Sequence, residues 1–497
     1  MKVKTSHIAL TEKTTTFLTS TKKMLVNNQW IESEAKKTFD TLNPANGNVL
    51  TKIPIADEND VDNAVVIARN AFDLIWKDGI KPAERSDLLW KLATLIERDI
   101  KIFMELETLD NGKPLEKAKY DVLGAINHLK YYAGWATKIE GTTIPTHSNK
   151  LVYTKKEPLG VVGLIVPWNF PLMIAIWKLA PALACGNCCI LKPAEQTPLT
   201  ALYLGKLILE AGFPPGVVNI ITGPGIPTGQ AMSQHMDIDK ISFTGSTLVG
   251  KKIMEASAKS NLKKVSLELG GKSPNVIFED ADLDMVLDSL QWSSFYNTGQ
   301  ECTLGSRIYV QESIFEKVLK SFKEKAGKMT ISNGFNNPDL GPMISEKQLN
   351  TVLDYIELGE TEGAKLVYGG NRLDGDLAKG YFLEPTIFIT KNEDLTIARE
   401  EIFGPVVVVS KFKDFDEVIK KANTSKYGLA AAVWTKDLSK AHRFANAIDA
   451  GTVWINGYDL FDAAVPFGGF KQSGNGKEMG KSAIDLYTKE KAVWTVL

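Results

Sequence analysis

Apolar residues recur at helical spacing in the first third of the chain. Leu88, Leu92 and Leu95 are separated by three or four positions, the spacing that places side chains on one face of a helix. The residues before them, 1–23, are polar and rich in Thr and Lys, and we expect a flexible N-terminal arm there. The apolar spacing predicts three helices: Val61–Phe72, Ala83–Glu107 and Glu116–Trp135.

From Gly160 onward, short runs of β-branched residues alternate with helical segments. Strands separated by helices of this length imply parallel crossovers, and therefore a parallel sheet with helices on both faces. Such sheets place ligands at the carboxyl ends of their strands. The expected strands are Gly160–Val166, Cys188–Leu191, Val217–Ile221, Lys240–Phe243 and Lys264–Leu267, and the helices are Pro171–Ala184, Pro198–Ala211 and Thr247–Ser260.

A second alternating region follows Gly270 and predicts a second α/β domain. Residues 138–153 and 483–497 differ from both regions, because they resemble paired strand arms that are apolar enough to need a partner. The expected strands of the second region are Arg307–Val310, Val406–Phe412, Ala430–Trp434 and Thr452–Ile455, with helices at Ser313–Ala326, Glu417–Ala422 and Ser439–Ala447.

Composition narrows the class of protein. A chain of 497 residues suggests about three domains, and 44% hydrophobic with 24% charged residues is typical of a globular protein. The 58 basic residues balance 59 acidic ones, so no net field favours nucleic acid or an anionic membrane. Four cysteines are too few for a disulfide scaffold. No long uninterrupted apolar run or secretory core is present, and we expect a cytoplasmic protein with no membrane partner.

Motifs that bind phosphate are mostly absent. The glycines of Gly223–Gly229 are one residue too widely spaced for the dinucleotide fingerprint, and two GKS tripeptides lack the upstream glycine of an ATP loop. Phe243–Thr247 ends a strand and opens a helix. Free backbone N–H groups there could receive a pyrophosphate, although an ordinary helix cap explains the segment equally well.

Metal and redox sites are not favoured. The histidines have no partner at helical spacing, so a zinc site is not expected. Cys185 and Cys188 form a C-x-x-C in an apolar passage without a second half, which favours packing over metal or redox chemistry. The five histidines are His7, His128, His147, His235 and His442.

Three residues are candidates for chemistry. Cys302 follows a polar, glycine-containing loop, where backbone N–H groups could favour its thiolate. Glu268 ends an apolar strand before two glycines. The leucines on either side of it favour the neutral form of its carboxyl, which is how a glutamate becomes a proton acceptor near neutral pH. The alternative is that Glu268 belongs to a buried ion pair. Asn169 lies at a strand end before a helix and could stabilise an oxyanion, unless it only forms a turn or helix cap.

Taken together, these segments resemble the NAD(P)-dependent aldehyde dehydrogenase superfamily, nearest its broad-specificity aldehyde and retinal dehydrogenase branch. The resemblance extends from about Met24 to the end of the chain. It also accounts for the absent glycine fingerprint, since that family holds NAD on a variant Rossmann sheet. The motifs that carry it are PLGVVGLIVPWNFP (158–171), LKPAEQTP (191–198), FTGST (243–247), LELGGKSP (267–274), NTGQEC (297–302), EEIFGPV (400–406) and PFGGFKQSG (466–474).

The resemblance implies a domain plan. An α/β variant Rossmann domain that binds NAD comprises residues 24–137 and 157–267, and a second α/β catalytic domain comprises 268–478. A β-strand oligomerisation arm comprises 138–156 and 479–497. The resemblance thus implies a homo-oligomer, either a dimer or a tetramer, whose subunits the arm joins.

The resemblance also implies residue roles. Cys302 attacks the aldehyde to give a thiohemiacetal and then a thioester, the Asn169 amide and the Cys302 N–H hold the oxyanion, and Glu268 activates water. Lys192 and Glu195 bind the adenine ribose, which favours NAD over NADP because a carboxylate repels a 2′-phosphate. The other expected cofactor residues are Ile165, Pro167, Trp168, Gly225, Gly229, Phe243, Gly245, Ser246, Leu269, Glu401 and Phe403.

Substrate choice is inferred from the residues that match the family's tunnel. So many aromatic side chains suit an apolar, aromatic or bulky aldehyde such as retinal; betaine aldehyde or another small aldehyde is the alternative. Two other classes of protein remain as alternatives to an aldehyde dehydrogenase: a non-redox thiol esterase or acyltransferase, and a catalytically silent NAD-binding structural protein. Glu301 would disfavour the thiolate if it points inward. The tunnel residues are Gly124, Phe170, Trp177, Tyr296, Glu301, Thr303, Phe461 and Phe467.

Overall fold

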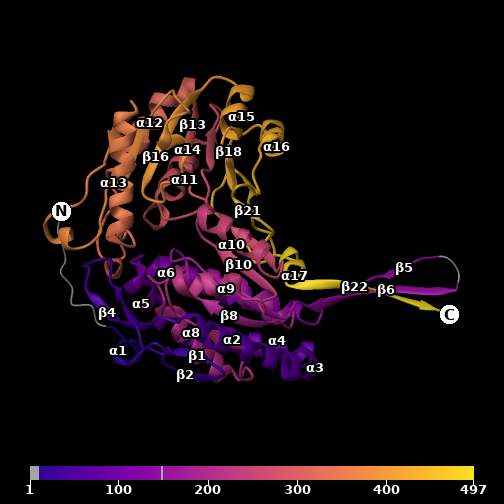
Figure 1. The fold of residues 1–497 in the computed structure, drawn as a ribbon. Coiled ribbons are helices and arrows are strands. Elements are labelled where there is room, and N and C mark those ends of the chain that lie inside the picture. Colours follow the sequence, from indigo (N-terminus) through magenta and orange to yellow (C-terminus); the bar gives the residue numbers. More distant parts are fainter. Residues whose placement is uncertain (1–9, 147–148) are drawn as a thin grey trace.

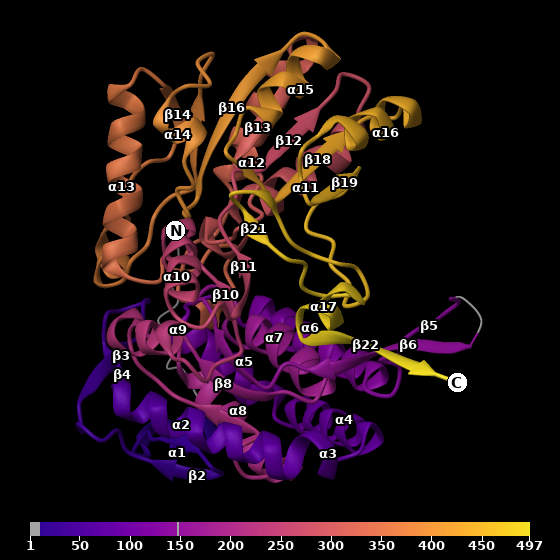
Figure 2. The same cartoon turned by 45° about the vertical axis from the view of Figure 1, so that its right-hand side comes forward.

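The computed structural model describes residues 10–146 and 149–497. The described chain forms two bodies, each built on a twisted sheet with helices, and a narrow arm that projects from them (Figure 1). Turning the molecule by 45° keeps the same division, with the N-terminal half below and the later residues above (Figure 2). The expected combination of two α/β sheets and a strand arm is confirmed. Two expected histidines, His7 and His147, lie outside the described residues.

The first sheet has the strand order β2-β1-β9-β8-β7-β10-β11-β21. Strands β7 to β11 are parallel to one another, as predicted, whereas β1 and β21 join the edges in antiparallel fashion. Strands β7 and β8 are buried throughout, which explains their continuous apolar sequences. The bounds are β1 Met24–Val26, β2 Gln29–Ile31, β7 Val161–Ile165, β8 Cys188–Lys192, β9 Val218–Ile220, β10 Lys240–Thr244, β11 Lys264–Glu268 and β21 Gly474–Asn475.

One helix predicted in this region is two helices. The apolar spacing runs through residues 83–107, but α4 ends at Arg98 and α5 begins at Ile100. Between them Asp99 is buried and accepts a hydrogen bond of 2.8 Å from the Tyr203 hydroxyl. The helices around this sheet are α2 Glu58–Ala71, α4 Pro82–Arg98, α5 Ile100–Asp110, α6 Leu115–Trp135, α7 Pro171–Ala184, α8 Leu199–Ala211, α9 Gln230–Gln234 and α10 Thr247–Lys259.

The N-terminal arm is also different from the expectation. Within the described residues, Glu12–Thr19 form a helix, α1, and do not belong to a loose arm. The Thr11 side chain caps this helix and donates a hydrogen bond of 2.8 Å to Glu105 of α5. A buried carboxylate on α5 therefore fixes a segment whose polar composition alone suggested disorder.

The second sheet has the order β14-β15-β16-β13-β12-β18-β19 and is parallel except where β14 meets β15. It confirms the second α/β unit and adds strands β12, β14 and β15, which the sequence pattern did not predict. The strands are β12 Pro274–Ile277, β13 Arg307–Gln311, β14 Lys365–Tyr368, β15 Thr386–Ile389, β16 Val406–Phe412, β18 Ala430–Trp434 and β19 Thr452–Ile455. The helices are α11 Leu283–Phe295, α12 Phe315–Ala326, α13 Glu346–Thr361, α14 Thr396–Arg399, α15 Phe415–Asn423 and α16 Leu438–Ala447.

The projecting arm is a three-stranded antiparallel sheet of order β22-β6-β5. Strand β6 (Lys150–Pro158) pairs along its whole length with β22 (Thr488–Val496), and β5 (Thr143–Ile144) adds at the other edge. The predicted pairing of these two distant segments is therefore confirmed. That the arm joins subunits stays a prediction, which its exposed apolar residues Ile144, Leu151, Trp494 and Val496 support.

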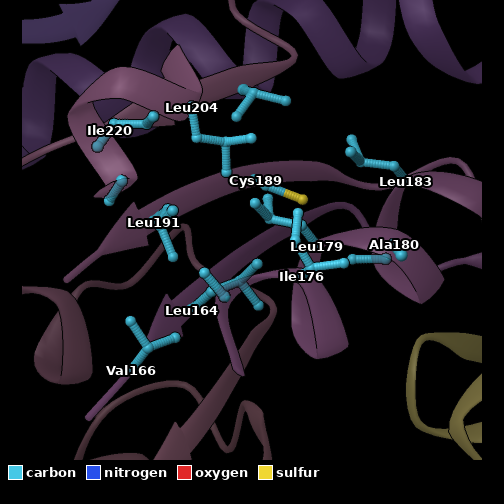
Figure 3. Packing of buried hydrophobic residues seen from close by; sticks show 14 of the residues in the cluster. Leu164, Val166, Ile176, Leu179, Ala180, Leu183, Cys189, Leu191, Leu204 and Ile220 are labelled. Carbon is cyan, nitrogen blue, oxygen red and sulfur yellow. The ribbon is translucent and has the colours of Figure 1, made fainter. Parts of the chain in front are cut away.

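The three clustered cysteines belong to the core of the first body. Cys185, Cys188 and Cys189 are buried, and Figure 3 shows Cys189 among aliphatic side chains such as Leu179 and Leu191. Burial raises the pKa of the Cys185 thiol to about 12, so these groups stay protonated, as the packing interpretation requires. Among the residues that the structure describes, no helix is both long and apolar enough to cross a bilayer.

Candidate active site

Glu268 is the last residue of β11, paired on one side with Thr244 of β10 and on the other with Gly474 of β21. The carboxyl is buried, and its Oε2 atom has no hydrogen-bond partner among the described residues. Burial raises the pKa of Glu268 well above its usual range. A desolvated carboxylate of this kind is a strong proton acceptor once it ionises. The alternative of a buried ion pair finds no support, since no cation of the described chain contacts Glu268 as a salt bridge.

A buried ion pair does lie beside this carboxyl. Lys178 of α7 contacts Glu478, which also accepts a 3.0 Å hydrogen bond from Ser242 of β10. Glu478 raises the pKa of Glu268 and Lys178 lowers it. We did not identify this pair from the sequence. The available signal was a lysine in the middle of the otherwise apolar helix Pro171–Ala184, since fully buried lysines are rare unless paired.

Cys302 lies in a loop between the short helix Tyr296–Gly299 and β13. The residue as a whole is partly exposed, unlike the three buried cysteines, whereas its thiol group is enclosed by neighbouring atoms. Gly271, three residues after Glu268, packs directly on this loop: a Cβ placed on Gly271 would lie 2.3 Å from the Cys302 carbonyl oxygen. Only glycine allows this approach. The end of β11 and the cysteine loop are thus held in contact.

The electrostatics of Cys302 differ from the expectation. Burial of the thiol raises its pKa well above the usual range, and the nearby carboxyls of Glu301, Glu401 and Glu268 raise it further. The prediction that loop N–H groups favour the thiolate is therefore wrong for this state. Negative charges and desolvation outweigh them. A base must take the thiol proton before sulfur can act as a nucleophile.

Asn169 faces the cysteine loop. Its side-chain Nδ2 donates a hydrogen bond of 3.0 Å to the carbonyl of Gln300, two residues before Cys302. An amide has two N–H hydrogens, so this contact leaves one for another acceptor. Asn169 is not the helix cap of the alternative reading, because the N-cap position of α7 is Phe170. The arrangement suits a donor aimed at an oxygen that develops charge near the cysteine.

Glu301, whose orientation the sequence left open, points inward. Its carboxyl is buried beside that of Asp459, which accepts a 3.0 Å hydrogen bond from the Thr303 hydroxyl. Burial raises the pKa of Asp459 to about 7 and the pKa of Glu301 well above its usual range. Two adjacent carboxyls cannot both ionise freely, so the pair carries at most one negative charge near neutral pH. Asp459 was not among the predicted residues.

Neutralising this pair should make Cys302 more reactive. In a double variant, Glu301→Gln with Asp459→Asn, the negative charge disappears while the hydrogen-bonding shapes persist. The thiolate then suffers less repulsion, so the pKa of Cys302 falls. We expect its iodoacetamide alkylation rate at neutral pH to rise about threefold or more, because a lower pKa increases the thiolate fraction. When the alkylation rate is measured from pH 6 to 10, the rise of the rate with pH should occur at lower pH in the variant than in the wild-type protein. Coincident curves would remove the pair from the control of this thiol.

A cavity of about 610 Å³ opens at the carboxyl ends of β7, β8 and β10. On its wall, the Lys192 ammonium donates hydrogen bonds to the carbonyls of Gly223 and Pro193, at 2.7 and 2.9 Å. Its position matches that of ligands in open α/β sheets. The predicted cofactor residues that line it are Ile165, Pro167, Trp168, Lys192, Glu195, Gly225, Gly229, Phe243 and Gly245.

Four predicted cofactor residues lie next to the cavity and do not line it. Ser246 caps α10, its hydroxyl accepting the Val249 N–H at 3.3 Å, and Leu269 packs against Gly250 of the same helix. Glu401 accepts the Gly271 N–H at 2.9 Å. The Phe403 ring meets the Trp168 ring edge-on, with centroids 5.1 Å apart. Glu401 and Phe403 therefore connect the cavity to the end of β11.

The predicted tunnel residues fall into two aromatic groups. Trp177, Phe461 and Phe467 contact one another, with ring centroids 5.6 to 6.3 Å apart, and Cys302 packs against the same cluster. In the second group, Phe170 stacks on Tyr296 at 6.2 Å. Gly124 of α6 lies outside both: a Cβ there would meet the sulfur of Met173 at 3.2 Å.

Comparison with known proteins agrees with this geometry. The model of the aldehyde dehydrogenase family matches residues 30–493. The chain is 52% identical to retinal dehydrogenase 2 of Gallus gallus, over 95% of this chain and 91% of that protein. It is 51% identical to an aldehyde dehydrogenase of Emericella nidulans, over 95% and 94% of the two chains. The structure of an aldehyde dehydrogenase from Bacillus cereus in complex with NAD+ superposes with a TM-score of 0.97 at 48% identity, covering 99% of this chain and 100% of that one.

The fold and the comparisons define an α/β, NAD-dependent oxidoreductase. The chain belongs to the aldehyde dehydrogenase family, as its sequence motifs predicted.

Proposed function

We propose that this protein oxidises an aldehyde to the carboxylic acid with NAD+ as the electron acceptor. The observation that carries the proposal is the contact between Gly271 and the Cys302 backbone, which joins the buried carboxyl of Glu268 to a partly exposed cysteine. Spectroscopic detection of NADH on mixing the protein with NAD+ and an aldehyde tests it. A thiol esterase or acyltransferase would consume ester without forming NADH, and a silent NAD-binding protein would turn over neither substrate.

The residues around the cavity fit a dinucleotide. Its volume of about 610 Å³ is within the usual range for ligand sites. A lysine and a carboxylate, Lys192 and Glu195, lie together on its wall, and such groups can bind ribose hydroxyls. The start of α10 adds N–H groups and the positive end of a helix dipole, which suit a pyrophosphate. NAD+, when bound, supplies the acceptor for the hydride that leaves the substrate carbon.

The chemistry at the cysteine follows from the arrangement of its neighbours. The Cys302 thiol gives up its proton to solvent, and the resulting thiolate attacks the aldehyde carbonyl carbon to form the oxyanion of a thiohemiacetal. The remaining N–H of the Asn169 amide and the Cys302 backbone N–H stabilise the charge on its oxygen. Oxidation at that carbon leaves a thioester on the sulfur. Glu268 then accepts a proton from water as the water attacks the thioester, which releases the acid and restores the thiol.

An apolar, aromatic or bulky aldehyde suits this site best. Cys302 packs against the cluster that contains Trp177 and Phe467, and Phe461 adds a third ring to these two. Such aromatic walls favour apolar substrates. The 52% identity to a retinal dehydrogenase supports the same class. Steady-state kcat/KM values for retinal, benzaldehyde, acetaldehyde and betaine aldehyde provide the test. A preference for betaine aldehyde would overturn the proposal of an apolar substrate.

Glu195 should select NAD over NADP. The 2′-phosphate of NADP adds negative charge, and a carboxylate at that position repels it. We expect Glu195→Gln to raise kcat/KM for NADP about tenfold while NAD is used less well. Glu255, which lines the same cavity on α10, offers a matched control: Glu255→Gln should leave the NADP to NAD ratio nearly unchanged. Equal ratios in wild type and Glu195→Gln would contradict the assignment.

The arm should join subunits into a homo-oligomer. Its strands β6 and β22 expose Leu151, Trp494 and Val496 to solvent in the single chain, and such an apolar surface is expected to associate. Light scattering of the full chain measures the mass of the particle in solution. A mass equal to that of one chain would contradict this part of the proposal.

A further inference from the structure

The backbone carbonyl of Asn169 is held by side chains that are distant from it in the sequence. Lys113, in the loop between α5 and α6, donates from its ammonium to this oxygen at 2.8 Å. Asn297 donates to the same oxygen at 3.1 Å. Asn111 donates to the neighbouring carbonyl of Trp168 at 2.8 Å. Consecutive carbonyls of the turn before α7 are therefore fixed by donors that are distant in sequence.

Lys113 is itself rigidly placed. It is buried, and its ammonium contacts the Asp121 carboxylate and lies 3.7 Å from Glu107. The same ammonium lies 4.4 Å from the centre of the Phe170 ring. Glu107 also accepts the N–H of Leu172 at 2.9 Å, in the first turn of α7. Charged hydrogen bonds are stronger and more directional than neutral ones, so these contacts fix the ammonium and the turn together.

The backbone carbonyl and the side-chain amide of Asn169 thus bind different partners. Its carbonyl is bound by Lys113, while its side-chain amide reaches the Gln300 carbonyl in the loop that carries Cys302. A shift of the carbonyl would rotate the peptide and move the amide away from the reacting centre. Displacements of about 1 Å can cost about a hundredfold in rate. We propose that Lys113, assisted by Asn111, is a positioning residue that holds the Asn169 amide where the oxyanion develops.

A purely structural interpretation makes a different prediction. If Lys113 only neutralises the buried carboxylates Glu107 and Asp121, its loss weakens the fold but does not act through Asn169. Loss of one partner of a buried pair is costly for stability in both cases. Thermal stability alone cannot separate the two interpretations, whereas coupling between Lys113 and Asn169 can.

The inference rests on the proposed aldehyde oxidation, and a double-mutant cycle tests it. We expect Lys113→Met to lower kcat about 10- to 100-fold, since loss of an oxyanion donor costs about 10²- to 10³-fold. NAD+ affinity, measured by fluorescence titration, should change less than about twofold, because Lys113 does not line the cavity. In an Asn169→Ala background, Lys113→Met should cost less than about threefold. Equal losses in the two backgrounds would overturn the proposal.

Lys117→Met is the matched control. Lys117 lies four residues further along the chain, in the first turn of α6, and its ammonium contacts the carbonyl of Asp339. Its effect on kcat should therefore be the same with and without Asn169. If Lys113→Met does not fold, Asn111→Ala replaces it in the cycle and should show the same loss of effect in the Asn169→Ala background. Additive effects of Asn111 would overturn the proposal.

Hydrogen exchange separates failure of this inference from failure of the proposed function. In Lys113→Met, peptides that include residues 167–172 and 297–302 should exchange faster than in wild type, because the bond to the Asn169 carbonyl is lost. Unchanged exchange in both peptides would overturn the positioning role whatever the reaction. Absence of NADH formation in the wild-type protein would instead reject the proposed function.

Discussion

Cys302→Ala should abolish aldehyde oxidation, with kcat/KM reduced by at least about 10⁴-fold. The variant lacks the sulfur that forms both covalent intermediates, and the other cysteines cannot replace it because they are buried in the core of the first body. NAD+ should still bind, since Cys302 does not line the 610 Å³ cavity. NADH formation and fluorescence titration with NAD+ measure the two effects separately.

Cys189→Ala is a suitable control for this experiment. Its side chain packs among aliphatic residues (Figure 3), so its loss should lower the thermal midpoint through a small cavity and leave kcat nearly unchanged. If Cys302→Ala kept even a hundredth of wild-type turnover, another group would have to be the nucleophile.

Glu268→Gln should separate the two halves of the reaction. Acylation of Cys302 and the first release of NADH continue, but hydrolysis of the thioester loses its base. We expect a burst of about one NADH per site, followed by a steady rate lower by about 10²- to 10⁴-fold. Rapid mixing measures the burst, and mass spectrometry of the quenched protein should find the acyl group on Cys302.

The pH dependence provides a second measurement on the same residue. A base acts only when deprotonated, and burial raises the pKa of Glu268 above its usual range. Wild-type deacylation should therefore rise with pH through that raised pKa, whereas Glu268→Gln should lack this rise. An unchanged steady rate in the variant, or the same pH profile, would remove Glu268 from the role of base.

Local patterns predicted much of this fold. Alternating β-branched runs and helices gave the five parallel strands from β7 to β11, because a buried strand has a continuous apolar sequence that is easily recognised. The break at Asp99 was not predictable in this way. Apolar spacing continues across it, and one partner of the buried Asp99 carboxylate, Tyr203, is 104 positions away.

The same distinction between local and long-range information applies to the residues of the candidate site. Glu268, Cys302 and Asn169 could be proposed as candidates because each lies at a strand end or in a polar loop close to glycine or proline. The residues that tune them were not. Glu478 lies 300 positions from Lys178, and Lys113 lies 56 positions from Asn169, so only the fold brings them together. The raised pKa of Cys302 was not expected from the loop sequence either: desolvation is its main cause, and it depends on the fold, as does the inward orientation of the adjacent Glu301.

Strand β21 has a consequence for how the polypeptide can be divided. Gly474 pairs with Glu268, and the N–H of Leu269 donates to Ser473 at 2.8 Å, so the late chain returns to complete the sheet of the early one. A fragment that stops near residue 267 would leave β11 as a bare edge, prone to aberrant pairing between molecules. The two halves are therefore not interchangeable modules. A chimera that takes one half from a homologue would need β11 and β21 from the same parent, so that the two strands still pair.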